Sequence, residues 1–248
     1  MPRGVHGEKL YAAMNSAKLP ATDKPRLKAA LDKYDVWIEQ VNDADAPTLE
    51  ELIKIMVSLL QEYKYYIDVT LIFDSPNDFL YRQKGQTKID NTVIEEFLPV
   101  FVRKCLIKQY GQCDLVIGTQ QKVFSSAFFD SSLGSPQIGG GLVIKQKDQD
   151  FSMSRELFIR SSFDPSFSPN ETKTWTTNIG YVLAEIKTNL DKTMFQEASA
   201  TSHDVKTACT GAKYFLLCDY LDMTPINTAT TDIEEILILR KAKRLASN

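Results

Sequence analysis

Histidine, paired cysteines and long apolar segments are scarce or absent in this chain of 248 residues. Its only histidines are His6 and His203, so a histidine-rich metal centre or a serine-type catalytic triad is difficult to build. The four cysteines show no CxxC spacing, which favours reduced thiols over zinc ligands or disulfides. The N-terminus lacks the apolar segment of a signal peptide, and no run of about 18 apolar residues occurs. These absences predict a cytoplasmic protein.

The overall charge identifies no partner. A net charge of −3 provides no whole-chain attraction to nucleic acid, so any DNA-binding surface must be local. With 43% apolar and 25% charged residues, the composition is that of an ordinary globular protein. The length allows one large domain, or one domain with a smaller companion.

The first third of the sequence has helical periodicity. Apolar residues recur at i, i+3, i+4 and i+7 over residues 24–43, and a second helix is expected over residues 46–67. Residues 75–91 are polar and rich in turn formers, which is typical of a boundary. We therefore predict an N-terminal helical region over residues 1–88 and a second domain over residues 89–248.

The pattern changes after Asn91. A helix is expected from Asn91 to Gly111, with a kink at Pro99, and short strand-like runs follow it. The expected strands are 114–118, 122–129, 141–160, 181–186, 213–221 and 234–241, with polar loops at 130–141 and 161–178 and a helix at 191–208. A strand, a helix and a strand in succession predict a right-handed parallel βαβ unit.

An E-x-K sequence ends the expected strand at 181–186. Side chains alternate along a strand, so Glu185 and Lys187 project to one side and Ile186 to the other. Two other E-x-K sequences, at 62–64 and 171–173, fall in a helix and in a polar loop, where such charges are usually solvated. The pair at 185 and 187 is either a surface ion pair or part of a catalytic site, and sites in α/β sheets gather at strand ends.

A further carboxylate lies 35 residues earlier, in the sequence KDQDF. Two carboxylates and a lysine on adjacent strands suit Mg2+-dependent hydrolysis of phosphodiesters, because the acids hold the cation and the lysine positions the attacking water. Either Asp148 or Asp150 could supply the second carboxylate. The alternative is that both are residues of a hairpin turn.

The order of helix, strands, Asp, E-x-K, helix and strand resembles that of the PD-(D/E)xK nuclease superfamily. More specifically, the C-terminal two thirds is similar to subunits of BbvCI-type restriction endonucleases. The pieces that carry this resemblance are VIEEFL (93–98), KDQDF (147–151), AEIKTNLDK (184–192), AKYFLLCDYLDMTP (212–225) and IEEILILRK (233–241). The resemblance implies a mixed α/β fold, with an αβββαβ core around a mixed central sheet and an added N-terminal helical region.

The resemblance also implies particular site residues. The motif acid directly before Phe falls on Asp150, and the helical Glu before Phe falls on Glu96. A helical wheel agrees, because it places Glu96 on the flank of the buried face and Glu95 on the far side. The expected catalytic set is Asp150, Glu185, Lys187 and Glu96, and its three acids are the expected ligands of Mg2+. Gln149 stands where the superfamily has proline.

The implied activity is that of a bacterial, Mg2+-dependent type II restriction endonuclease subunit. It would hydrolyse double-stranded DNA at a short sequence resembling an interrupted CTNAG core. The alternative is a DNA-binding or assembly subunit with a nuclease fold, which is inactive or only nicks without a partner subunit. Two strands require two active sites, so we expect a homodimer or a heterodimer with a similar subunit. The N-terminal helices are expected to contribute to dimerisation or DNA binding.

Sequence specificity is expected to lie outside the motif. The loops at 130–141 and 161–178 are candidates for contacts in the DNA groove. Basic residues near these loops are candidates for phosphate contacts. They are Lys145, Lys147, Arg155 and Lys173.

Overall fold

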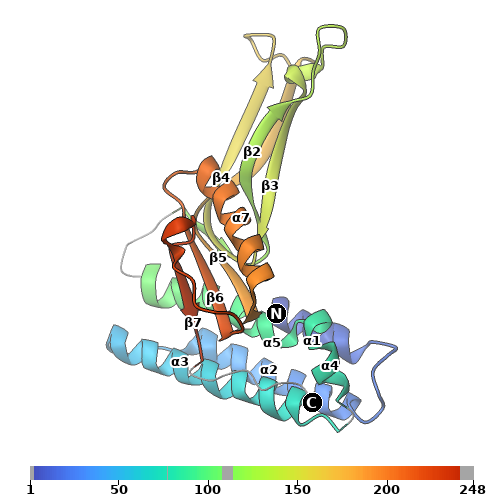
Figure 1. The fold of residues 1–248 in the computed structure, drawn as a ribbon, viewed down its shortest axis with the longest axis vertical. Helices are drawn as coiled ribbons and strands as arrows, with labels where there is room; N and C mark the ends of the chain where they lie inside the picture. Colours follow the sequence, from blue (N-terminus) through green and yellow to red (C-terminus); the bar gives the residue numbers. More distant parts are fainter. Residues whose placement is uncertain (1–2, 77, 108–113, 241–248) are drawn as a thin grey trace. The chain divides into compact units, whose positions relative to one another are not determined.

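A computed structural model describes residues 3–76, 78–107 and 114–240 (Figure 1). The chain forms two compact units, which we call the helical unit (Met1–Cys113) and the sheet unit (Asp114–Asn248). No helix among the described residues is both long enough and apolar enough to cross a membrane.

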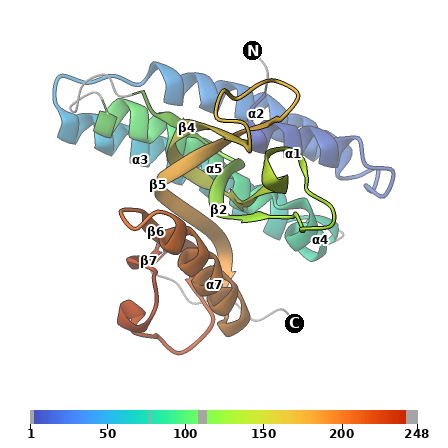
Figure 2. The same cartoon turned by 90° about the horizontal axis from the view of Figure 1, so that it is seen from above.

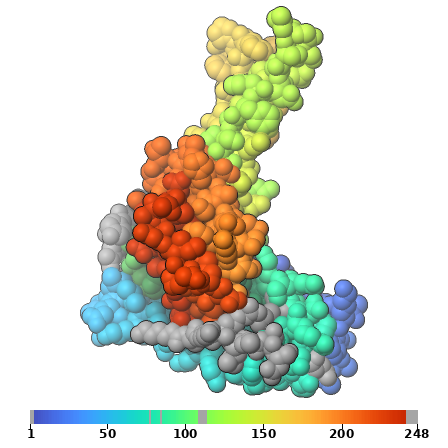
Figure 3. Space-filling model, in the orientation of Figure 1, coloured from blue at the N-terminus to red at the C-terminus, as the bar shows by residue number. Residues whose placement is uncertain are grey.

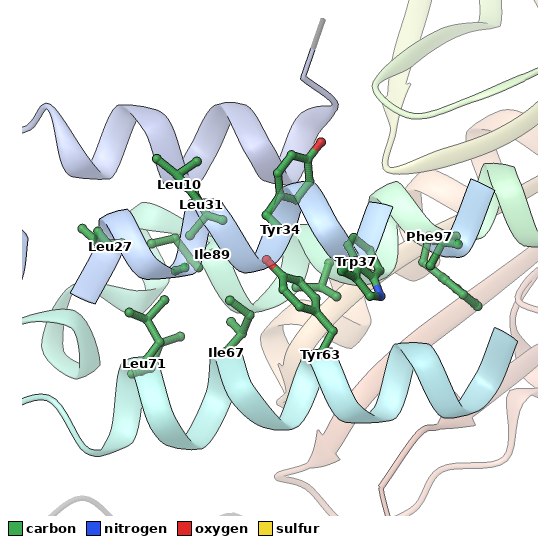
Figure 4. Close-up of a cluster of buried hydrophobic side chains, with 14 of the residues drawn as sticks. Leu10, Leu27, Leu31, Tyr34, Trp37, Tyr63, Ile67, Leu71, Ile89 and Phe97 are labelled. Atoms are coloured by element: carbon green, nitrogen blue, oxygen red, sulfur yellow. The ribbon is translucent and has the colours of Figure 1, made fainter. Parts of the chain in front are cut away.

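The helical unit is built from helices that share one hydrophobic core. They are α1 (Val5–Met14), α2 (Lys24–Asp43), α3 (Leu49–Tyr65), a π-helix (Tyr66–Phe73), α4 (Phe79–Thr87), α5 (Ile89–Phe101) and a second π-helix (Val102–Ile107). The helix expected over residues 24–43 is confirmed. Figure 4 shows the core, in which the rings of Trp37 and Tyr63 stack with their centroids 4.4 Å apart.

Helix α5 belongs to this helical core by its packing. Its buried residues Ile89, Val93 and Phe97 join the cluster that the first three helices form. The compact units consequently divide between Cys113 and Asp114, and not at residues 88 and 89, where a polar composition suggested a boundary. Composition was misleading here because residues 79–87 of the polar stretch form a helix.

The helix expected from Asn91 differs at its start. It begins at Ile89, after Lys88 in the left-handed conformation with φ of 52°. Pro99 lies inside α5, and a π-helix replaces the α-helix from Val102. A proline has no backbone N–H to donate within the helix, which is consistent with a change of hydrogen-bonding pattern soon after it. The expected end at Gly111 lies outside the described residues.

The sheet unit contains two sheets and one long helix. Its elements are β1 (Val116–Gly118), β2 (Gln121–Phe129), a 3-10 turn (Ile138–Gly141), β3 (Leu142–Gln149), β4 (Phe151–Ser162), β5 (Thr172–Leu190), α7 (Lys192–Ala208), β6 (Lys213–Leu221), a 3-10 turn (Thr228–Thr230) and β7 (Glu235–Ile238). The larger sheet has the order β1-β4-β5-β6-β7, and β2 pairs with β3 in the smaller one.

The larger sheet is mixed, as expected for the fold class. Strands β1, β4 and β5 are antiparallel, whereas β5, β6 and β7 are parallel. Helix α7 connects β5 to β6, and Figures 1 and 2 show it alongside these strands. Its apolar residues Phe195, Ala198 and Val205 pack in one core with residues of both strands. The crossover forms because the apolar side of α7 is buried against the sheet.

Strands β2 to β5 form an extension of the sheet unit, which ends in two chain reversals (Figures 1 and 3). The strands are longer than expected, so the second reversal spans only residues 163–171 and not 161–178. A hydrogen bond from the Gly139 N–H to the Glu171 carbonyl, at 3.2 Å, joins the two reversals. Gly141 has φ of +66°, and a Cβ atom there would lie 2.2 Å from the Asp130 carbonyl oxygen. Glycine is therefore required at this position.

Candidate active site

Asp150 lies where the chain passes from one sheet to the other. Strand β3, which ends at Gln149, pairs with β2, whereas β4, which begins at Phe151, pairs with β1 and β5. The hairpin-turn interpretation of the DQD sequence is therefore wrong, because β3 and β4 do not pair with each other. Asp148 is an exposed residue of β3, opposite Lys122 in the smaller sheet.

The strand register brings Asp150 next to the E-x-K sequence. Phe151, the residue after Asp150, is paired with Ala184, the residue before Glu185, in an antiparallel ladder. Asp150 Oδ2 accepts a hydrogen bond of 2.8 Å from the backbone N–H of Ile186. The two carboxylates thus come from adjacent strands at one place in the sheet.

Glu185 and Lys187 share a face of β5 and form an ion pair. Lys187 Nζ lies 2.6 Å from Glu185 Oε1, and the two side chains are 25% and 19% exposed. The other carboxylate oxygen, Glu185 Oε2, accepts a hydrogen bond of 2.8 Å from the hydroxyl of Tyr214 on β6. Sequence reasoning missed Tyr214. The available signal was a tyrosine near the start of the apolar run of the next expected strand.

The electrostatics of this cluster favour the charged form of Lys187. Burial lowers the pKa of Lys187, but the hydrogen bond and charge of Glu185 and the charge of Asp150 outweigh it, and the pKa is raised. The pKa of Tyr214 is raised as well, first by burial and then by the charges of Glu185 and Asp150. Lys187 is therefore an ammonium ion and Tyr214 a neutral donor at ordinary pH.

The donor chemistry of this cluster suits a hard divalent cation. Mg2+ prefers oxygen ligands and keeps several of its waters, so one or two carboxylates are enough to hold it. Asp150 and Glu185 supply two carboxylates, and an ionised carboxylate has about four lone-pair sites. Among residues 3–76, 78–107 and 114–240, no group of three or more His, Cys, Asp and Glu residues is placed to hold a metal ion.

Glu96 lies within the helical unit, where its carboxylate is bonded to residues of α1 and α2. Glu96 Oε1 accepts a hydrogen bond of 2.6 Å from the Tyr34 hydroxyl. Glu96 Oε2 accepts from the backbone N–H groups of His6, at 2.7 Å, and Gly7, at 3.3 Å. These N–H groups belong to the first turn of α1, where helices bind anions. Glu96 thus caps α1, a contact that the sequence did not indicate.

Burial governs the protonation of Glu96. Burial raises the pKa of this carboxyl, and the hydrogen bonds from Tyr34, His6 and Gly7 oppose the shift without cancelling it. Glu95, which the helical wheel placed on the far side of the helix, is itself buried, with 4% of its surface exposed. The helical wheel used only apolar neighbours within α5, whereas the buried residues of this helix include Asp90, Glu95 and Glu96.

The four expected phosphate contacts all lie on the extension of the sheet unit. Lys145 on β3 is exposed, with its ammonium 5.3 Å from the centre of the Phe128 ring. Lys173, near the second reversal, lies 5.5 Å from the Trp175 ring. The other two are in surface ion pairs. These are Lys147 with Asp204, at 2.9 Å, and Arg155 with Asp114, at 3.2 Å.

Comparison with known proteins assigns the family. Residues 86–248, well over half of the chain, match the model of the Bpu10I restriction endonuclease family. The chain belongs to this family. It is a type II site-specific deoxyribonuclease, as the resemblance of the motifs implied.

Among solved structures, the fold is similar to that in the "native BbvCI A2B2 tetramer at low resolution". The TM-score is 0.59 at 20% sequence identity, over 96% of this chain and 83% of that one. This likeness confirms the expected fold class. No curated protein sequence matches the chain.

Proposed function

We propose that the sheet unit hydrolyses phosphodiester bonds of double-stranded DNA with Asp150, Glu185 and Lys187, and that Mg2+ is its cofactor. The observation that supports the proposal is the hydrogen bond from the Ile186 backbone N–H to Asp150 Oδ2, next along β5 from Glu185, together with the ion pair of Glu185 and Lys187. A surface ion pair alone would not explain a second carboxylate bonded to the same strand.

Each residue has a distinct role in this proposal. Asp150 and Glu185 hold the cation, and the backbone N–H of Ile186 fixes the orientation of Asp150. Mg2+, when bound, would polarise the scissile phosphate and lower the pKa of a bound water. Lys187 orients the attacking water and offsets the negative charge that develops on the phosphate. Its raised pKa argues against a role as general base, because an ammonium ion cannot accept a proton.

Sequence recognition is proposed for the extension of the sheet unit. Its two reversals, at residues 130–141 and 163–171, are not needed to hold the carboxylate pair and project from strands that are rigidly paired. Phosphate contacts are proposed for the basic residues of the same extension. Ion pairs at the surface stabilise little, so Lys147 and Arg155 can exchange their carboxylate partners for phosphate at small cost. The proposed target resembles an interrupted CTNAG core.

Cutting both strands requires a second active site, so we propose an assembly of at least two such chains on DNA. The partner is either a second copy or a similar subunit. The similar structure is described as an A2B2 tetramer, which supports an assembly that contains two kinds of subunit. The N-terminal helices are proposed to contribute to the subunit interface or to DNA binding.

The test is digestion of plasmid DNA by the purified chain with Mg2+, followed by sequencing of the ends. Asp150→Ala and Glu185→Ala should abolish cleavage while DNA binding remains measurable with Ca2+. Asp148→Ala is the matched control. Because Asp148 is exposed on β3, the Asp148→Ala variant should cleave DNA normally. Cleavage that survives Asp150→Ala, but not Asp148→Ala, would reject the proposed site. Binding without cleavage by the native chain would instead favour the assembly subunit.

A further inference from the structure

Tyr214 is a buried residue of β6 that no argument from the catalytic motif includes. Its side chain has no exposed area, and it packs in one core with Leu183 and Leu216. A tyrosine enclosed in this way needs a hydrogen-bond partner, because an unpaired hydroxyl in an apolar surrounding is destabilising. The hydroxyl donates to Glu185 Oε2 at 2.8 Å.

The strand register explains why Tyr214 meets Glu185. In the parallel pair of β5 and β6, Tyr214 lies beside Leu183, and Glu185 lies beside Leu216. Leu183 and Glu185 project to the same face, since they are two residues apart. The phenol of Tyr214 therefore reaches along this face to the carboxylate of the next residue on that side. The aliphatic residues around the ring leave it little room to turn elsewhere.

Two donors hold the Glu185 carboxylate from two directions. Lys187 Nζ lies 2.6 Å from Oε1, and the Tyr214 hydroxyl lies 2.8 Å from Oε2. Lys187 is partly exposed and has a long flexible side chain, whereas Tyr214 is fixed by its packing. Tyr214 is thus the rigid member of the pair. Partners of this kind orient a metal-binding carboxylate, and their loss typically costs 10- to 100-fold in metal affinity or activity.

We propose that Tyr214 is a positioning residue, whose hydroxyl fixes the orientation of Glu185 for binding a divalent cation. The inference rests on the proposed function of Glu185 as a metal ligand. Tyr214 does not contact the reacting atoms. It acts by removing the rotational freedom of a carboxylate that must otherwise be ordered when the cation binds.

The test uses Tyr214→Phe in the full-length chain, because this change keeps the ring and removes only the hydroxyl. Ca2+ binding is measured by titration calorimetry, and plasmid cleavage is measured over a range of Mg2+ concentrations. We expect the dissociation constant for Ca2+ and the half-saturating Mg2+ concentration to rise about 10- to 100-fold. Circular dichroism should show an unchanged fold. A purely structural role for Tyr214 would give the same spectrum, so the two metal measurements decide between the roles.

Tyr220→Phe is the matched control on the same strand. Tyr220 is only partly buried, and the guanidinium of Arg240 lies 5.7 Å from its ring centre. This control should leave both metal measurements at native values. Native-like metal affinity and cleavage in Tyr214→Phe would overturn the inference. Failure of the native chain to bind Ca2+ or cleave DNA would reject the proposed function, and the inference with it.

A second measurement covers the case in which Tyr214→Phe does not fold. The native chain is labelled with 13C at the tyrosine Cζ atoms, and Glu185→Gln identifies the signal of Tyr214. That signal is expected to move during a Ca2+ titration, with the midpoint that calorimetry gives. A Tyr214 signal that stays still while Ca2+ binds would overturn the inference.

Discussion

Replacement of Glu96 by Ala tests whether this residue serves the helical unit as a cap. The change removes the acceptors of the Tyr34 hydroxyl and of the His6 N–H, which lie 2.6 Å and 2.7 Å from the carboxylate oxygens. A buried donor left without a partner costs about 1–3 kcal/mol. Two such donors are left without a partner, but removal of a poorly hydrated charge offsets part of this cost. We therefore expect the free energy of unfolding to decrease by about 2–4 kcal/mol.

The assay must report on the helical unit alone. Trp37 stacks on Tyr63 in its core, so Trp37 fluorescence follows the unfolding of this unit in urea once Trp175 is replaced by Phe. Hydrogen exchange of residues 5–14 should quicken in Glu96→Ala, because the first turn of α1 loses its cap. Glu50→Ala is the control. Its exposed ion pair with Lys54 should contribute less than about 1 kcal/mol.

The pH dependence gives an independent check on Glu96. Burial raises its pKa, so the folded chain binds the proton more tightly than the unfolded chain does. The free energy of unfolding should therefore fall as pH rises from the ordinary pKa of a glutamate through the raised one, and Glu96→Gln should lose this dependence. If Glu96→Ala leaves α1 exchange and stability unchanged but weakens Ca2+ binding, the cap argument fails and the expected metal role is supported.

The remaining predictions concern the sheet unit. Gly141→Ala should destabilise the first reversal by about 1–3 kcal/mol in thermal unfolding, because of its positive φ and the nearby Asp130 carbonyl, whereas Gly134→Ala, with open space around it, should not. Asp191→Ala should lower stability by about 1 kcal/mol, since the Asp191 side chain caps α7 through the Met194 N–H; a native melting temperature would contradict this. Lys187→Met should abolish cleavage yet leave circular dichroism unchanged, and residual cleavage near the native rate would exclude its proposed role.

Sequence patterns located the elements whose local signals agree with their packing. The helical period of residues 24–43 coincides with α2, and the apolar run at 213–221 coincides with β6. The helix expected at 191–208 corresponds to α7, because Asp191 is a good N-cap and the apolar positions recur on one side. In these segments, propensity, capping and burial favour the same conformation.

Other features depend on contacts that no local pattern encodes. The Thr- and Lys-rich sequence of the first half of β5 has no apolar alternation and therefore predicts a polar loop. In the structure, this half of β5 pairs with β4 along its whole length. The break between β3 and β4 is equally hidden, since strand-forming residues continue on both sides of Asp150. Pairing with distant strands decides both cases, and sequence reasoning has no access to it without a partner strand.

The change of sheet at Asp150 links the fold to the site. A strand that continued straight past Gln149 would keep its pairing with β2 and would not bring the next residues against β5. By changing partners at a single residue, the chain pairs Phe151 with Ala184 and places the Asp150 carboxylate beside the Ile186 N–H. The proline that the PD-(D/E)xK superfamily has at this position would remove the N–H of the residue before the acid and restrict the chain there. Gln149 occupies that position as the last residue of β3, still opposite Gln121, so in this chain the change of partners is achieved without a proline.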